Sequence, residues 1–159
     1  MTRPIHDAVA EEAFALQEHR ELLPWIDRIH DVGCSIGHLP ASQLAVSLHR
    51  VLVWLEGDLQ AHAAWEEAWL YPELDERAGT PWATRTMRFG HEQVRAAIRR
   101  LAAEQAHLDH ELTNAQASHL ASHVFGLEAV LRAHLECEER VLLPLLEDAV
   151  AAHEAVPVV

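Results

Sequence analysis

The chain has 159 residues, half of them apolar, and a formal net charge of −13 at pH 7. A single domain of this size buries enough apolar surface to fold alone. The negative charge argues against nucleic acid or an anionic membrane surface as a partner, and no apolar run approaches the roughly 20 residues of a membrane span. The N-terminal residues lack the apolar core of a signal peptide, so we expect a cytoplasmic protein with Cys34 and Cys137 reduced.

The chain contains 13 histidines, and several of them belong to an internal repeat. The segments His62–Pro72 and His134–Pro144 share the His, two consecutive Glu, a Leu and the Pro at an offset of 72 residues. His19 and His91 are separated by the same 72 residues. The chain is therefore predicted to consist of two copies of a helix pair, each with a single histidine followed by His-x-x-x-Glu.

The first predicted helix covers residues from about 7 to 31. Proline inside a helix removes a backbone hydrogen bond and crowds the preceding turn, so Pro24 predicts a kink just past His19. Two glycines and a proline between Asp31 and Pro40 predict a loop. The inner stripe of this helix comprises Val9, Leu16, His19, Leu22, Leu23, Ile26 and Ile29.

The second helix is expected from about Ser42 to Leu74, bending or ending near Pro72 and finishing by Gly79. Steps of three and four residues place one apolar stripe on the core face of this helix and of its repeat. The stripe comprises Leu48, Leu52, Leu55, Leu59, His62, Glu66 and Trp69, and its copy comprises Leu120, Val124, Leu127, Leu131, His134, Glu138 and Val141.

Thr80 and Pro81 form a helix start signal, so the third helix is expected from there to about Glu111. The capping-box pattern from Thr113 to Gln116 opens a fourth helix that continues to about residue 151. No segment has a strand pattern. We predict an all-α, up-down-up-down antiparallel four-helix bundle over residues 1–152, built from two helix-pair repeats, and a flexible tail at 153–159. The inner stripe of the third helix comprises Met87, His91, Val94, Ile98, Leu101 and Leu108.

Antiparallel turns bring the repeated polar residues to one level of the bundle, nearer the end that holds the N-terminus and the turn around Thr80. A buried carboxylate without a partner costs several kcal/mol, whereas a metal ion satisfies carboxylates and imidazoles together. Residues four apart on a helix reach the same centre. The predicted metal ligands are His19, His62, Glu66, His91, His134 and Glu138.

Four imidazoles and two carboxylates exceed the needs of one tetrahedral zinc ion, and calcium or magnesium would require mostly oxygen ligands. Two transition-metal ions fit better, with room for an oxide or hydroxide bridge and an outside ligand. Twofold symmetry assigns His19 and His62 to one ion, His91 and His134 to the other, and makes Glu66 and Glu138 bridges. Iron suits this donor set, and manganese or zinc remain possible. No catalytic group beyond these ligands is predicted.

The ordered pattern His19, His62-x-x-x-Glu66, His91, His134-x-x-x-Glu138 resembles the hemerythrin-like proteins, also called the HHE cation-binding family. The resemblance covers nearly the whole chain and implies a four-helix bundle with a non-haem diiron centre. Members of the family bind dioxygen reversibly, sense oxygen or iron, handle nitric oxide or damaged iron–sulfur centres, or decompose peroxide.

Two departures from the oxygen carriers shape the functional expectation. The carriers have a fifth histidine where this chain has Arg95, and they end with His-x-x-x-x-Asp where this chain has His134-x-x-x-Glu138. The symmetric set resembles peroxide-handling and nitric-oxide or repair members. We expect a diiron protein that reacts with peroxide or dioxygen, catalase-like and active against oxidative stress, with an electron donor as a possible partner. An oxygen or nitric-oxide binding or sensing module, and an iron store or donor, stay open.

The remaining candidates are interpreted more plainly. Glu67 and Glu139 are predicted either to support the ligands and pair with arginines, among them Arg95 and Arg140, or to be solvated charges. His119-x-x-x-His123 and His107-x-x-His110 have metal-binding spacing but flank the inner stripe, which favours surface or interface positions. Cys137 is predicted to be a packed thiol. The aromatic residues Phe14, Trp65, Trp69, Tyr71 and Trp82 are predicted mainly to pack near the site.

Overall fold

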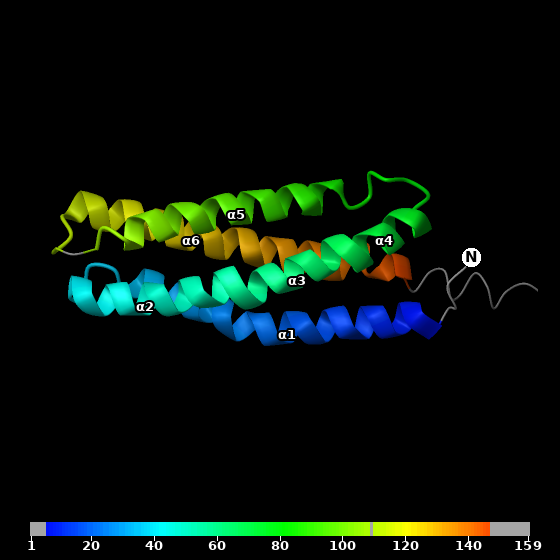
Figure 1. Ribbon diagram of the computed structural model, residues 1–159, viewed down its shortest axis with the longest axis horizontal. Coiled ribbons are helices and arrows are strands. Elements are labelled where there is room, and N and C mark those ends of the chain that lie inside the picture. Colours follow the sequence, from blue (N-terminus) through cyan, green and yellow to red (C-terminus); the bar gives the residue numbers. More distant parts are fainter. Residues whose placement is uncertain (1–5, 109, 147–159) are drawn as a thin grey trace, which may run out of the picture.

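A computed structural model describes residues 6–108 and 110–146, with side chains from Glu12 onward. Its helices run antiparallel as four rods of one bundle (Figure 1), which confirms the predicted architecture, and the described residues contain no strand. The first rod packs against the second and the fourth, and the third packs against the fourth and the second. The rods comprise α1 (His6–Ser35); α2 (Ala41–Trp54), α3 (Gln60–Trp65) and α4 (Tyr71–Arg77) in succession; α5 (Arg85–Gln105); and α6 (Asn114–Cys137).

Helix α1 is longer than the sequence predicts. It is assigned as one helix through Pro24 and ends at Ser35, where a loop from Asp31 was expected. Gly33 lies inside the helix. A Cβ there would come 2.7 Å from the ring of Phe125, so the absence of a side chain at this position allows α1 and α6 to approach each other. The turn is made instead by Gly37, whose φ of 82° suits glycine. Leu23, expected on the inner stripe, is 40% exposed.

Three π-helical segments interrupt the α-helices: η1 (Leu55–Leu59), η2 (Glu66–Leu70) and η3 (Glu138–Leu142). The last two occupy equivalent positions of the repeat and start at its glutamates. The amide N–H groups of Tyr71 and Leu143 donate to the carbonyls of Glu66 and Glu138, five residues earlier. Pro72 and Pro144, which have no N–H to donate, follow directly. The second rod therefore continues through Pro72, because the turn before this proline widens into a π turn and the helix does not end there.

The π turns change which residues face the core. A wider turn holds more residues, so the side chains that follow are rotated relative to an α-helix. Trp69 and Val141, predicted on the inner stripe, are 56% and 59% exposed, while Leu70 and Leu142 are buried. The prediction was wrong for these two residues because it assumed an unbroken α-helical period.

Helix α5 begins at Arg85 rather than at the predicted start by Thr80. The backbone N–H and the hydroxyl of the buried Thr84 both donate to the carboxylate of Asp75, each at 3.0 Å. This long-range contact holds the connection as turns until residue 84. Helix α5 also ends at Gln105, short of the predicted Glu111.

Helix α6 starts as predicted. Thr113 Oγ1 accepts from the N–H of Gln116, and Gln116 Oε1 accepts from the N–H of Thr113, which completes the capping box. The predicted helix end near residue 151 and the predicted tail lie outside the described residues. No helix in the described part of the chain is both long and apolar enough to cross a membrane.

The core consists of two apolar clusters separated along every rod by a buried polar layer. Helix α1 shows the order: Ala15 belongs to the smaller cluster, His19 to the polar layer and Leu22 to the larger cluster. The smaller cluster lies toward the end of the bundle where α1 begins and α4 connects to α5 (Figure 1). Apolar packing on both sides shields the polar layer from water.

Candidate metal centre

All six predicted ligands meet in the polar layer, and each is at most 8% exposed. They come from all four rods. Their donor atoms fall into two groups in which every atom lies within 4.8 Å of the others. The first group comprises His19, His62 and Glu66, and the second comprises Glu66, His91, His134 and Glu138.

The first half of the layer is formed by the two histidines of the first repeat. His62 Nε2 lies 2.9 Å from Glu66 Oε1, one helical turn along the same rod. His19 Nε2 lies 3.5 Å from Glu66 Oε1 and also 3.5 Å from Glu138 Oε2. One oxygen of each carboxylate therefore faces this half.

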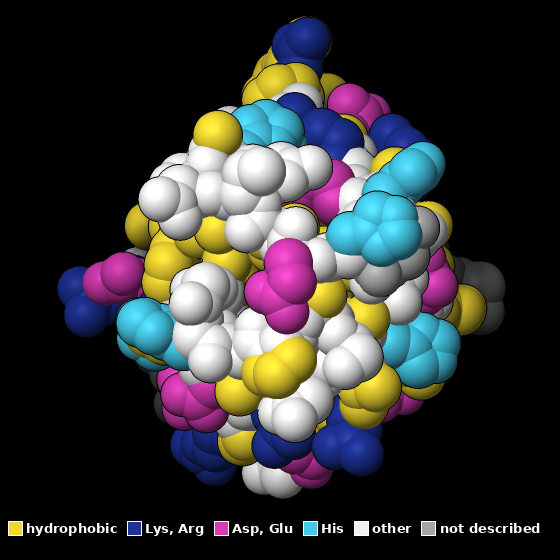
Figure 2. Space-filling view, turned by 90° about the vertical axis from the view of Figure 1, so that its left-hand side faces the viewer, with side chains coloured by type: hydrophobic (Ala, Val, Ile, Leu, Met, Phe, Trp, Pro, Cys, Tyr) yellow, Lys and Arg dark blue, Asp and Glu magenta, His cyan; other side chains and the backbone are white. Residues whose placement is uncertain are grey.

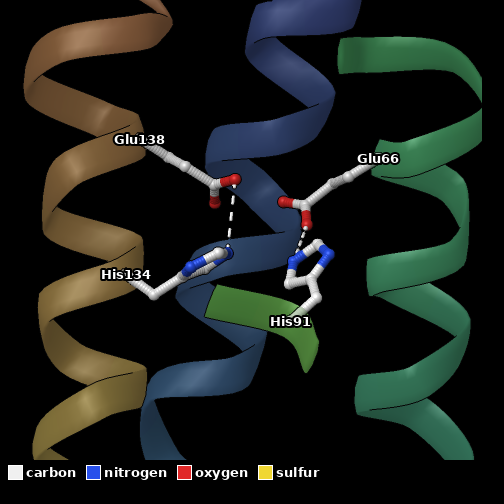
Figure 3. Close-up of side chains that lie close together, drawn as sticks. All are labelled: Glu66, His91, His134 and Glu138. Carbon is white, nitrogen blue, oxygen red and sulfur yellow. Dashed lines mark ion pairs between the residues drawn. The ribbon is translucent and has the colours of Figure 1, made fainter. Parts of the chain in front are cut away.

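The second half contains the other two histidines (Figure 3). His91 Nε2 lies 3.1 Å from Glu66 Oε2, and His134 Nε2 lies 3.4 Å from Glu138 Oε1. Each carboxylate thus directs one oxygen to each half. The two groups of donor atoms each contain one of the two histidine pairs that the repeat defines.

Tyr71 also belongs to the site, whereas the sequence interpretation placed it among aromatic residues expected mainly to pack nearby. Its hydroxyl lies 3.3 Å from His91 Nε2, 3.4 Å from His134 Nε2 and 3.4 Å from Glu66 Oε2, and it donates to Glu138. The π turn aligns Tyr71 with Glu66, five residues earlier, so a search by α-helical period misses it. A detectable signal was the repeat itself, because the equivalent of Tyr71 is Leu143 and the two halves differ there.

The two halves also differ in hydrogen bonding. In the second half, each of the four ligand atoms contacts the Tyr71 hydroxyl. In the first half, five buried atoms have no hydrogen-bond partner among the described residues. One is His62 Nδ1, and the other four lie close together: His19 Nε2, His62 Nε2, Glu66 Oε1 and Glu138 Oε2. Buried polar atoms without partners are costly, and a transition-metal ion would satisfy these nitrogens and oxygens together. The donor set therefore fits a metal ion.

A second set of contacts, made to the Nδ1 atoms, orients two of the histidines. Glu139 Oε1 lies 3.0 Å from His19 Nδ1, and Glu67 Oε1 lies 2.8 Å from His91 Nδ1. Each of these glutamates supports a histidine of the other repeat. Since a carboxylate can only accept, Nδ1 donates, and this orientation turns Nε2 toward the centre. Of the two roles considered for these residues, support of the ligands is the one their contacts bear out.

The arginine partners agree only in part with expectation. Arg95, which stands where the oxygen carriers have a histidine, donates to Glu67 Oε1 at 2.6 Å. Arg140 instead pairs with Glu136 at 3.1 Å. Cys137 is partly buried and packs against the smaller cluster, as predicted.

Without metal, positive charge on protonated histidines balances the negative charge of the carboxylates in the polar layer. Burial by itself lowers the pKa of His19, but Glu138 and Glu66 outweigh it and raise this pKa to about 10. Burial raises the pKa of Glu66, but the close imidazoles of His19, His62 and His91 hold it well below its usual value. Burial and the two carboxylates raise the pKa of Tyr71, so its hydroxyl keeps its proton.

Two hollows flank the ligands. A small cavity of about 20 Å³ is lined by His62, His91 and His134 and otherwise mainly by apolar side chains such as Ile26 and Leu131. A cavity of this size holds about one water-sized molecule. A surface groove of about 470 Å³ reaches His62 from outside and carries the acidic residues Glu18, Glu21 and Asp58. His62 therefore lines both the cavity and the groove.

The aromatic residues near the site divide by position. The rings of Phe14 and Trp65 meet edge to face at 4.8 Å, and Trp65 lies 6.3 Å from the ring of His62. This pair covers the outer side of His62. Trp69 and Trp82, which were expected to pack, are 56% and 62% exposed.

The fold and the buried histidine–glutamate clusters define a metal-binding four-helix bundle. The family model of the hemerythrin HHE cation-binding domain matches residues 13–155, so the chain belongs to this family. Comparison with curated proteins and with solved structures gives no match. The match confirms the resemblance that the ligand pattern indicated.

Replacing Tyr71 with Phe is expected to destabilise the metal-free protein more than the metal-loaded protein. Loss of the hydroxyl leaves buried atoms of the second half without a partner, at a cost of about 1–3 kcal/mol. A bound ion satisfies the same atoms, so the loaded form loses less. Urea unfolding with and without bound metal measures both effects, and an equal loss in the two forms would contradict the assignment.

Gly90→Ala is expected to weaken metal binding by about tenfold or more, which is the size of the loss seen when a group that orients a metal ligand is removed. A Cβ at Gly90 would lie 2.8 Å from His134 Nδ1, so the imidazole must move. Gly126→Ala is the matched control, because a Cβ there meets nothing within 4 Å. Competition with a chelator compares the two variants, and equal affinities would show that the position of His134 is unimportant.

The stability of the metal-free protein is expected to fall between about pH 6.5 and pH 10. The raised pKa of His19 stabilises the fold fully below its unfolded value of 6.5, and this contribution is lost as the pH rises through about 10. The loss is on the order of several kcal/mol. The lowered pKa of Glu66 has the opposite effect: it stabilises the fold above about pH 4.5, and this contribution is lost as the pH falls below that value. Urea unfolding across this range should show the alkaline loss in the metal-free form and a smaller one once a metal replaces the proton.

Proposed function

We propose that this protein is a non-haem diiron protein that reacts with peroxide or dioxygen. The observation that carries the proposal is the division of both carboxylates between two pairs of histidines. His19 and His62 would hold one iron ion, His91 and His134 the other, and Glu66 and Glu138 would bridge them. When bound, the iron pair would supply the change of oxidation state that such chemistry needs.

The surroundings of the ligands support a small substrate. The cavity of about 20 Å³ beside the histidines has room for about one very small molecule, which favours a substrate such as hydrogen peroxide, dioxygen or nitric oxide. Its apolar walls, among them Leu22 and Leu59, keep additional water away from the reacting atoms. The surface groove that His62 also lines lies on the outer side of this ligand, where a small molecule would approach it.

The residues around the ligands can also donate and accept protons during a reaction. Tyr71 keeps its proton, and its hydroxyl donates a hydrogen bond to Glu138 in the second half. Glu67, about 30% exposed, connects His91 to the solvent side of the bundle. Disproportionation converts two molecules of hydrogen peroxide into one dioxygen and two water molecules. It balances without an outside reductant, so we favour this catalase-like reaction.

A second candidate is reversible binding or sensing of dioxygen or nitric oxide, and the apolar cavity favours it. The cavity lining contains no hydroxyl group, and its polar members are the ligands themselves and Gln60. Storage or donation of iron is less well supported, because all six ligands are at most 8% exposed and an ion held by them would leave slowly.

Metal analysis combined with a peroxide-decay assay tests the proposal. The purified protein is expected to hold two iron ions per chain and to release dioxygen from peroxide at half the rate of peroxide loss. The variant His62→Ala should lose iron and turnover, while His49→Ala, at an exposed position of α2, should keep both.

Each other result points elsewhere. Two irons without turnover, but with a reversible spectral change under dioxygen or nitric oxide, would replace the enzyme with a sensor or carrier. Ready transfer of iron to an acceptor would indicate a store. One iron or none per chain after reconstitution would refute the diiron centre itself.

A further inference from the structure

We propose that Glu104, His119 and His123 form a second site, for a single divalent transition-metal ion of the zinc type. The three residues lie at the end of the bundle away from the predicted iron ligands, where α5 ends and α6 begins (Figure 1). This site is independent of the proposed iron chemistry.

The geometry brings one donor from each residue together. His119 and His123 are one turn apart on α6, and their ring centroids are 4.3 Å apart. Glu104, in the last turn of α5, places its Oε1 2.6 Å from His123 Nδ1 and 3.4 Å from His119 Nδ1. The three donor atoms all lie within 4.8 Å of one another. The spacing of the two histidines alone favoured a surface position, and Glu104 from a second helix supplies the missing ligand.

Two atoms of this cluster are shielded from solvent without a hydrogen bond. His123 Nδ1 and Glu104 Oε2 have no hydrogen-bond partner among the described residues, although the two side chains are only partly buried, at 29% and 24% exposure. The close contact between His123 Nδ1 and Glu104 Oε1 is not aligned as a hydrogen bond. An ion bound by both residues would give these shielded atoms a partner.

The cluster opens on a groove of about 380 Å³ between the two helices. Figure 2 looks onto this end of the bundle, where several histidine side chains reach the surface among hydrophobic ones. His107 lines the same groove. Its Nδ1 lies 2.7 Å from the carbonyl of Ala103, which can only accept, so the Nε2 lone pair remains available.

The donor set determines the class of ion. Two imidazoles and one carboxylate, with the fourth position open to water, form the arrangement that zinc adopts in sites accessible to an outside ligand. Calcium and magnesium prefer oxygen ligands and are disfavoured. The ion would join the end of α5 to the start of α6 across the connection at 106–113, and its open position would accept a small anion or water.

Titration of the iron-loaded protein with Zn²⁺ tests the proposal. Calorimetry should show one further equivalent bound, and Co²⁺ in its place should give the visible bands of a tetrahedral ion. The double variant His119→Ala/His123→Ala should lose this equivalent, and Glu104→Gln should weaken it about tenfold or more. Iron content measured before and after each titration separates this site from the iron site.

The matched control is His38→Ala/His49→Ala, which removes two exposed imidazoles, one in the turn between α1 and α2 and one on α2. It should bind Zn²⁺ as the parent does. The proposal is overturned if the parent binds no further equivalent, if the His119/His123 variant binds as much as the parent, or if the control loses binding equally. Loss of iron chemistry would leave this result unaffected.

Discussion

Two carboxylates in the middle of a helical bundle are the constraint on which this structure depends. Glu66 and Glu138 are 0% and 1% exposed, and a charge at such a depth destabilises a fold unless it is matched. Each carboxylate meets imidazoles from more than one rod, and Glu66 alone has His19, His62 and His91 within 3.5 Å. These contacts relate the axial positions of the rods to one another, because sliding one rod would leave a charge without its partner. The apolar clusters above and below then exclude water from the layer.

The same layer explains why the two repeats are not equivalent. Both repeats contain a π turn that begins at the glutamate and a proline that follows it. The residue between them is Tyr71 in the first repeat and Leu143 in the second. One half of the site therefore has a proton donor, and the other half has buried atoms without hydrogen bonds. The repeated histidines and glutamates form a symmetric set, but their surroundings in the two halves are not symmetric.

The glutamates that contact the Nδ1 atoms of the histidines connect the two repeats, because each glutamate contacts a histidine of the other repeat. Glu67 of the first repeat supports His91 of the second, and Glu139 of the second supports His19 of the first. The metal centre is thus built only when both helix pairs are assembled, which couples metal binding to the folding of the whole bundle. The cluster at the other end requires only α5 and α6, so the two regions can act separately.

Much of the fold and of the candidate site was predictable from local rules. The 72-residue repeat, the i, i+4 spacing of His62 with Glu66 and of His134 with Glu138, and the capping box at Thr113 are properties of nearby residues. These rules identified the family, the bundle and the six side chains that the structure brings together. They failed where the helical period changed, as at Trp69 and Val141, which the π turns rotate outward.

The tertiary structure alone decided the contacts between residues distant in the sequence. Asp75 moves the start of α5 by binding Thr84, Tyr71 enters the site beside residues of α5 and α6, and Glu104 meets a histidine pair on another helix. By itself the sequence determined which residues recur with a helical period, because that period is a property of the backbone. Which side chains from different helices meet depends on how the rods pack and where their turns widen, and no local pattern records this.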